Sequence, residues 1–177
     1  HEWGHGFDNS LKGFGSNNYV SEASRSSRRM RKEVAEGKIK IHDQAGFDRM
    51  YPPTSNKVDE AMADVMDGME SSGYQSRLRT VLRKMVGQKL ISQKKASDYW
   101  DSGRERFARS FERHVQYSLR ADGRDNTYLT GLGDTGEESL WPTDAEAKAM
   151  APAFDAMLAA YRQHKYGSEE KQKYSRS

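Results

Sequence analysis

The chain has 177 residues, of which 34% are hydrophobic and 31% are charged, and its net charge is +3. Because it contains no cysteine, it cannot carry a disulfide, a thiolate zinc site or a thiol nucleophile. No apolar run approaches the roughly 18–20 residues that cross a bilayer, and no signal peptide is visible, so we expect no membrane contact. The length suits one domain with a modest core.

The first segment, HEWGHGFDNSLKGF, has apolar residues at helical spacing and predicts a helix. Its apolar stripe consists of Trp3, Phe7, Leu11 and Phe14. Since this stripe points away from two histidines, we expect the helix to anchor through one face and to present the histidines on the other.

His1, Glu2 and His5 form an H-E-x-x-H string, the arrangement that binds Zn²⁺ in metal-assisted hydrolases. On a helix the two histidines project about 40° apart, so both rings can reach one ion. Glu2 projects about 100° from His1, where it can take a proton from an activated water without binding the metal. Asp8 returns to the histidine side, where it could accept a hydrogen bond from a ligand's ring. The alternative is a pair of histidines that only face solvent.

The next segment is basic and ends with a helix stop signal. Arg25–Lys32 carries five cations in eight residues, so it is either a solvated helix face or a contact surface for nucleic acid. Gly37 suits the left-handed conformation that closes helices. The following KIKIH alternates and predicts a short extended stretch, and the two prolines of YPPTSN predict a break.

Three further helices are predicted from apolar periodicity. The first begins after Asn56 as its N-cap, the second covers YQSRLRTVLRKMVGQKLIS, and the third covers SGRERFARSFERHVQYSLR. The glycine- and aspartate-rich ADGRDNTYLTGLGDTGEESLWP predicts a loop. The residues expected to face inward are Val58, Met62, Val65, Met66, Met69, Leu78, Val81, Leu82, Met85, Phe107, Phe111, Val115 and Leu119.

The last helix begins with a capping box from Thr143 to Glu146. Residues 167–177 predict a flexible polar tail. The sequence therefore predicts one mainly α domain over residues 1–166, with little or no sheet. Because its first residue already lies inside a motif, we expect an N-terminally truncated segment of a longer protein. The residues that this helix is expected to bury are Met150, Phe154, Met157, Leu158 and Tyr161.

A catalytic zinc usually has three protein ligands, so a third must come from elsewhere in the chain. His42, His114 and His164 are candidates by residue type only. Glu105 borders the apolar stripe of its helix, so its carboxylate could lie at a seam with the histidine helix. The same glutamate could instead complete a capping box with Ser102. Spacing alone leaves both interpretations open.

HEWGHGFD, followed later by YWDSGRERFARSFERHV, resembles the large polyvalent protein associated domain, first type. Such domains occur in very long multidomain proteins of phages and other mobile elements. The strings NTYL and GEESLWPTDAEAKAMAPAFDAML resemble the end of that family. The E-x-F-A-x-x-F string from Glu105 to Phe111 is also similar to the corresponding helix of lethal-factor-type gluzincins, which are H-E-x-x-H zinc peptidases.

These resemblances imply a zincin-like helical domain in which His1, His5 and Glu105 hold Zn²⁺ and Glu2 is the general base. They also imply that Tyr99 assists the transition state, although its spacing departs by one residue from the gluzincin pattern. The structural alternative for this tyrosine is an aromatic side chain packed beside its neighbouring tryptophan.

The implied function is a zinc-dependent metalloendopeptidase domain that hydrolyses protein or peptide substrates, in the cytoplasm or delivered by a phage. The alternative is a non-catalytic helical module that binds nucleic acid through Arg25–Lys32, or a protein partner.

Overall fold

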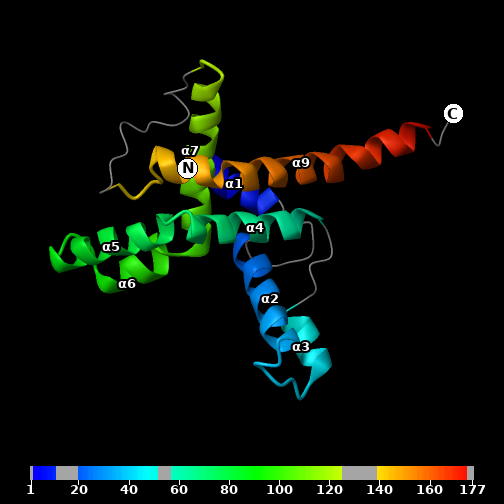
Figure 1. Ribbon diagram of the computed structural model, residues 1–177, viewed down its shortest axis with the longest axis horizontal. Helices are drawn as coiled ribbons and strands as arrows, with labels where there is room; N and C mark the ends of the chain where they lie inside the picture. The colour runs from blue at the N-terminus through cyan, green and yellow to red at the C-terminus, as the bar shows by residue number, and fades with distance from the viewer. Residues whose placement is uncertain (1, 11–19, 52–56, 125–138, 175–177) are drawn as a thin grey trace.

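The computed structural model describes residues 2–10, 20–51, 57–124 and 139–174, and side chains within 4–8, 26–51, 57–124 and 139–166 (Figure 1). Over these ranges the chain is mainly helical and contains no strand, which confirms the mainly α prediction. No helix among them is both long and apolar enough to span a bilayer. The helices are α1 (Glu2–Ser10), α2 (Val20–Ala35), α3 (Gln44–Met50), α4 (Lys57–Ser71), α5 (Tyr74–Gly87), α6 (Gln93–Lys95), the π-helical turn η2 (Ala96–Trp100), α7 (Gly103–Ala121) and α9 (Asp144–Tyr174).

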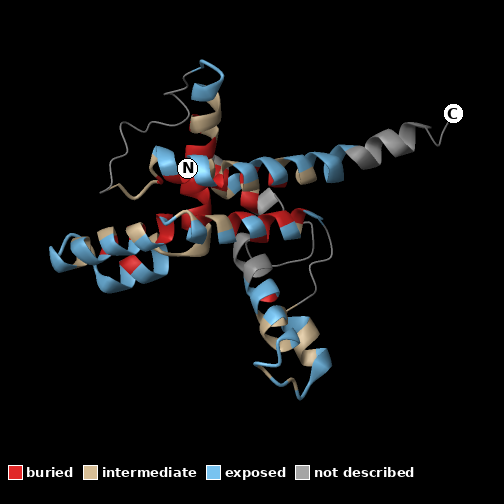
Figure 2. Ribbon diagram, viewed as in Figure 1, coloured by how far each residue is buried: buried red, intermediate tan, exposed pale blue. Residues whose placement is uncertain are grey.

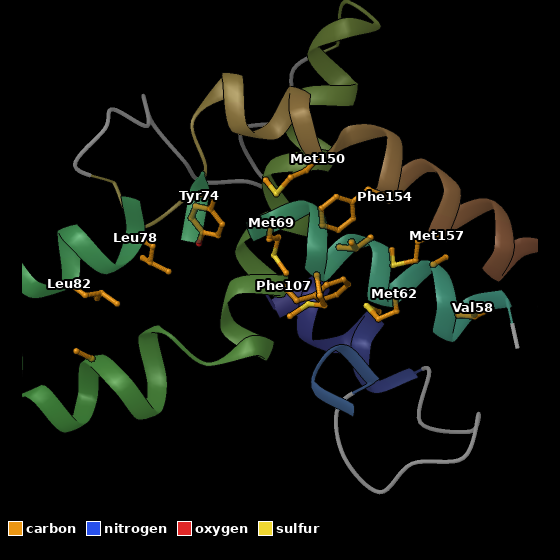
Figure 3. Packing of buried hydrophobic residues seen from close by; sticks show 14 residues of the cluster. Val58, Met62, Met69, Tyr74, Leu78, Leu82, Phe107, Met150, Phe154 and Met157 are labelled. Atoms are coloured by element: carbon orange, nitrogen blue, oxygen red, sulfur yellow. The ribbon is translucent and has the colours of Figure 1, made fainter. Parts of the chain in front are cut away.

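The core forms where α4, α7 and α9 meet (Figure 2). α4 packs along α9 and also contacts α2. α7 packs against both α9 and α1. Methionine supplies much of the filling, because its flexible side chain adapts to irregular gaps between helices. Figure 3 shows the central cluster, which includes Val58, Met62, Met69, Tyr74, Leu78, Leu82, Phe107, Met150, Phe154 and Met157.

Two predicted helix ends are confirmed by their hydrogen bonds. Gly37 has a positive φ of 70° and closes α2, with its amide donating to the carbonyl of Val34. At the start of α9, Thr143 and Glu146 form the full capping box: the Glu146 carboxylate accepts from the Thr143 amide at 2.8 Å, and the Thr143 hydroxyl accepts from the Glu146 amide at 3.3 Å.

The structure differs from the sequence prediction in two short segments, where a capped helical turn is found in place of extended or irregular structure. The segment KIKIH is irregular and not a strand, and α3, which was not predicted, follows it with Asp43 as N-cap. A second unpredicted turn, α6, is capped by Ser92, whose hydroxyl accepts from the Lys95 amide at 3.1 Å. The backbone of α9 stays helical to Tyr174, past the start of the predicted tail, since the lysines and glutamates there favour helix.

Some predicted features fall outside the described residues. These are the apolar positions Leu11 and Phe14, the N-cap Asn56, the prolines of YPPTSN, and the part of the predicted loop from 125 to 138.

Candidate functional site

The candidate site lies where α1 crosses α7 at very close range. A Cβ placed on Gly4 would lie 2.6 Å from the Cα of Ala108 and 2.8 Å from its carbonyl oxygen. Only glycine allows this approach, because the obstructing atoms belong to the backbone of α7 and cannot rotate away. The sequence therefore brings the backbones of the two helices into contact at this point.

Phe7 fixes the angle at which α1 lies across the core. Its ring stacks on Phe111 of α7 at 5.1 Å and meets Tyr161 of α9 edge-on, also at 5.1 Å. The sequence predicted that Phe7 anchors the helix and that His5 faces away from that anchor. In the structure both side chains reach α7, since Gly4 lies between them on the contact face.

His5 and Glu105, separated by a hundred residues in sequence, meet at this crossing. The Nε2 atom of His5 lies 3.0 Å from the Oε1 atom of Glu105. The carboxylate is buried, with 3% of its side chain exposed, whereas the His5 side chain is 20% exposed. Glu105 is thus the buried side chain of the pair, and His5 is partly exposed to solvent.

Both side chains are of types that bind zinc. Imidazole nitrogen and carboxylate oxygen bind zinc at about 2.0–2.2 Å, so in a tetrahedral site the two donor atoms lie roughly 3.3–3.5 Å apart. The observed distance of 3.0 Å is a few tenths of an ångström shorter than that range. It suits a direct hydrogen bond between the two side chains.

The two sequence interpretations of Glu105 are both partly realised. The Ser102 hydroxyl accepts a hydrogen bond from the Glu105 amide at 3.4 Å, so Ser102 is the N-cap of α7. The Ser102 amide, however, donates to the carbonyl of Tyr99 at 3.1 Å. The Glu105 carboxylate reaches His5, in contrast to the reciprocal box at the start of α9. The cap therefore positions the helix while the carboxylate stays at the seam with α1.

A buried arginine holds the start of α7. Arg109 is fully buried and donates to the carbonyls of Glu105 at 3.0 Å, of Leu140 at 3.3 Å and of Trp100. Its guanidinium also lies over the Trp100 ring at 5.4 Å. These contacts join η2, the first turn of α7 and the segment before α9. They therefore hold the backbone of the turn that carries Glu105. No pattern in the sequence indicated this role for Arg109.

The other predicted site residues are His1, Glu2, Asp8 and Tyr99, and the structure does not describe all of their side chains. His1 lies outside the described residues, and so does the side chain of Glu2, although Glu2 begins α1. Asp8 is fully buried. Tyr99 lies on η2 with 38% exposure, and its ring meets Trp100 edge-on at 5.0 Å, which is the packing that the structural alternative predicted. Its catalytic role stays a prediction.

The other candidate ligands do not join the pair. His114 is buried further along α7, where its ring stacks on Phe154 at 4.9 Å and its Nε2 atom lies 3.3 Å from an Asp155 oxygen. His42 and His164 are exposed. Among the side chains that the structure describes, no three histidines or carboxylates gather closely enough to hold a metal ion.

Glu112, two turns beyond Glu105 on α7, contacts the segment before α9. Its carboxylate accepts a hydrogen bond from the indole nitrogen of Trp141 at 2.9 Å. This contact fixes the segment before α9 against α7. Glu112 therefore serves as an internal comparison for Glu105: it is the same residue type on the same helix, but its hydrogen bond to Trp141 differs from the contact that Glu105 makes with His5.

The cations of Arg25–Lys32 whose side chains are described lie next to carboxylates of the same chain. Arg28 lies 2.5 Å from Asp64 of α4, and Arg31 lies 2.6 Å from Asp48 of α3. Arg29 pairs with Glu33 at 3.0 Å, and Lys32 lies 3.9 Å from Glu36. These pairs support the interpretation as a solvated helix face that joins α2 to α3 and α4. Nucleic-acid contact at this segment stays a prediction.

Residues 91–165 match the family model of the large polyvalent protein-associated domain 1. The match covers α6, η2, α7 and most of α9, including Tyr99 and Glu105, and agrees with the phage and mobile-element context implied by the sequence resemblance. The H-E-x-x-H string lies before the matched segment. No match was found among curated proteins or among solved structures.

Proposed function

We propose that the chain is a zinc-dependent metalloendopeptidase domain of a phage or mobile-element polyvalent protein. The observation that carries this proposal is the 3.0 Å approach of His5 Nε2 to Glu105 Oε1 across the α1–α7 crossing. The glycine at the crossing, the buried carboxylate and the partly exposed imidazole support this proposal, because imidazole and carboxylate are side-chain types that bind zinc.

In the proposed site, His1, His5 and Glu105 hold the ion and Glu2 remains free to move protons. The bound zinc would supply Lewis acidity and an activated water at neutral pH. Glu2 would accept the proton of that water and deliver it to the leaving amine. Glu105 would keep its carboxylate at the seam because Arg109 and Ser102 hold the backbone of its helical turn.

Tyr99 is proposed to steady the developing oxyanion with its hydroxyl. Its backbone is hydrogen-bonded to the start of α7, since its carbonyl accepts from the Ser102 amide and the neighbouring Trp100 carbonyl accepts from Arg109. These bonds link η2, which carries Tyr99, to the helix that carries Glu105.

The test is peptide hydrolysis by the parent and by Glu2→Gln, in a chain where further residues precede His1. The extension keeps a free α-amine next to His1 from chelating zinc itself. We expect the parent with zinc to cleave an unfolded protein substrate. Glu2→Gln should bind zinc as tightly but lose at least about a hundredfold in rate, as expected for a general base.

Cleavage should also stop on chelation and return with zinc. Equal cleavage by parent and variant would contradict the role of Glu2 and indicate a contaminating protease.

A further inference from the structure

The segment 74–97, which includes α5, the loop after it and α6, is strongly basic. We call it the basic arm. It contains seven lysines and arginines and no aspartate or glutamate. Because the whole chain has a net charge of only +3, the rest of the molecule is net acidic. Charge is therefore separated between the arm and the body.

The basic arm extends away from the crossing of α4, α7 and α9 (Figure 1), and most of its residues are exposed (Figure 2). Its apolar side chains are turned inward: Leu78, Leu82 and Ala96 are buried, and Val86 and Ile91 pack against the core cluster. Most lysines and arginines of the arm lie on its exposed surface.

Four cations of the arm have no carboxylate within ion-pair distance among the described residues: Arg83, Lys89, Lys94 and Lys95. Two others face the body, since Arg77 binds Glu146 at 2.8 Å and Arg79 binds Asp101 at 2.9 Å. This is the reverse of Arg25–Lys32, where the described cations are matched by nearby acids. The arm thus carries four cations of this kind within a short stretch of the chain.

A hollow of about 350 Å³ opens between α5 and the α6–η2 segment. Leu82, Val86 and Ala96 contribute apolar surface to it, and Arg83, Gln93 and Ser97 bring polar groups that can donate hydrogen bonds to an anion. Arg79 and Asp101 also line the hollow, where they form an ion pair with each other. The hollow is large enough for a phosphate group, and Arg83 is one of the four cations named above.

We propose that the basic arm binds nucleic acid through the phosphate backbone. Four cations spread over two helices and their loop suit a polymer with regularly repeated charges. The arm is poorly suited to a lipid surface, because membrane-binding helices bury a continuous apolar face. Leu90, with 66% exposure, is the large aliphatic side chain that the arm leaves open to solvent. The proposal is independent of zinc and of any hydrolytic activity.

The test measures binding of the full chain to a fluorescent mixed-sequence DNA duplex, with a chelator present, over a range of salt concentrations. If about four phosphates are contacted, the logarithm of affinity should fall with the logarithm of salt at a slope of roughly −4. The arm variant combines Arg83→Gln, Lys89→Gln, Lys94→Gln and Lys95→Gln. It should bind at least about tenfold more weakly near 0.1 M salt, with a slope close to zero.

A matched control removes four exposed cations from the body of the molecule: Lys40→Gln, Lys57→Gln, Lys148→Gln and Arg162→Gln. It changes the net charge by the same amount, so it should retain the parent's salt slope and most of its affinity. Equal weakening in both variants would overturn the proposal, because only total charge would then matter. Absent DNA binding together with binding to phosphatidylserine vesicles or to a polyglutamate peptide would also overturn it.

Discussion

Gly4 sets the distance between the two halves of the candidate site. It places the α1 backbone against Ala108 of α7, with His5 and Phe7 on either side of the contact. Any side chain at this position would push α1 outward and move His5 away from Glu105. The residue that controls the geometry of the pair is therefore not one of the two that would bind metal.

Gly4→Ala should destabilise the fold by about 1–3 kcal/mol, because the added methyl overlaps backbone atoms that cannot rotate. Urea denaturation measures this. Gly6→Ala is the matched control on the same helix, since a Cβ there meets nothing within 4 Å. It should leave stability unchanged or raise it by up to ~1 kcal/mol, because alanine favours helix. The prediction fails if both variants have the same stability.

At the residue scale, residue type and spacing singled out His5 as a candidate ligand, whereas Glu105 was favoured as its partner by the family resemblance and not by spacing. The sequence did not identify Gly4 or Arg109. A glycine inside a helix is ambiguous until its neighbour is known, and an arginine within a charged helix is usually solvent-exposed. The distinctive property of Arg109, its full burial against three carbonyls, depends on η2 and on the segment before α9.

At the scale of elements, α7 departs most from the simple helical pattern. Phe107 faces the core as its apolar stripe predicted. The same helix also buries Glu105, Arg109, Arg113 and His114, because it is surrounded by α1, α9 and η2. Apolar periodicity predicts the burial of apolar residues only. It therefore could not indicate that charged residues of α7 are buried as well.

His114 makes the α7–α9 contact sensitive to acid. Burial lowers its pKa below the ordinary 6.5, an effect that nearby Asp155 partly opposes. Its Nδ1 atom is buried without a hydrogen-bond partner among the described residues. As the pH falls below about 6.5, the unfolded chain binds a proton that the folded histidine does not yet bind. The free energy of unfolding should therefore decrease until the pH reaches the folded pKa.

His114→Phe should reduce this acid sensitivity, since a phenyl ring can keep the stack on Phe154 but does not titrate. The measurement compares the loss of Tm between about pH 7.5 and pH 5 in the two proteins. Groups other than His114 titrate alike in both and cancel. An identical loss of Tm would contradict the assigned burial of a neutral histidine.

At the scale of the whole molecule, local patterns in the sequence predicted most of the long helices, because helix formation depends on spacing and caps within a few residues. They did not predict which helices pack together. The α1–α7 crossing joins residues a hundred positions apart, and the projection of the basic arm follows from how α4 and α5 meet. The short turns α3 and α6 were also missed, since each depends on one capping residue.

The proposed zinc site is tested by comparing the zinc affinities of the parent, Glu105→Ala and Glu112→Ala. Each variant removes a buried glutamate from α7, and Glu105 is the one that lies 3.0 Å from His5, whereas Glu112 accepts a hydrogen bond from Trp141. We predict that Glu105→Ala lowers the affinity at least about a hundredfold in a chelator competition, while Glu112→Ala binds zinc like the parent and loses only stability. Parent-like zinc affinity in a folded Glu105→Ala would contradict the account.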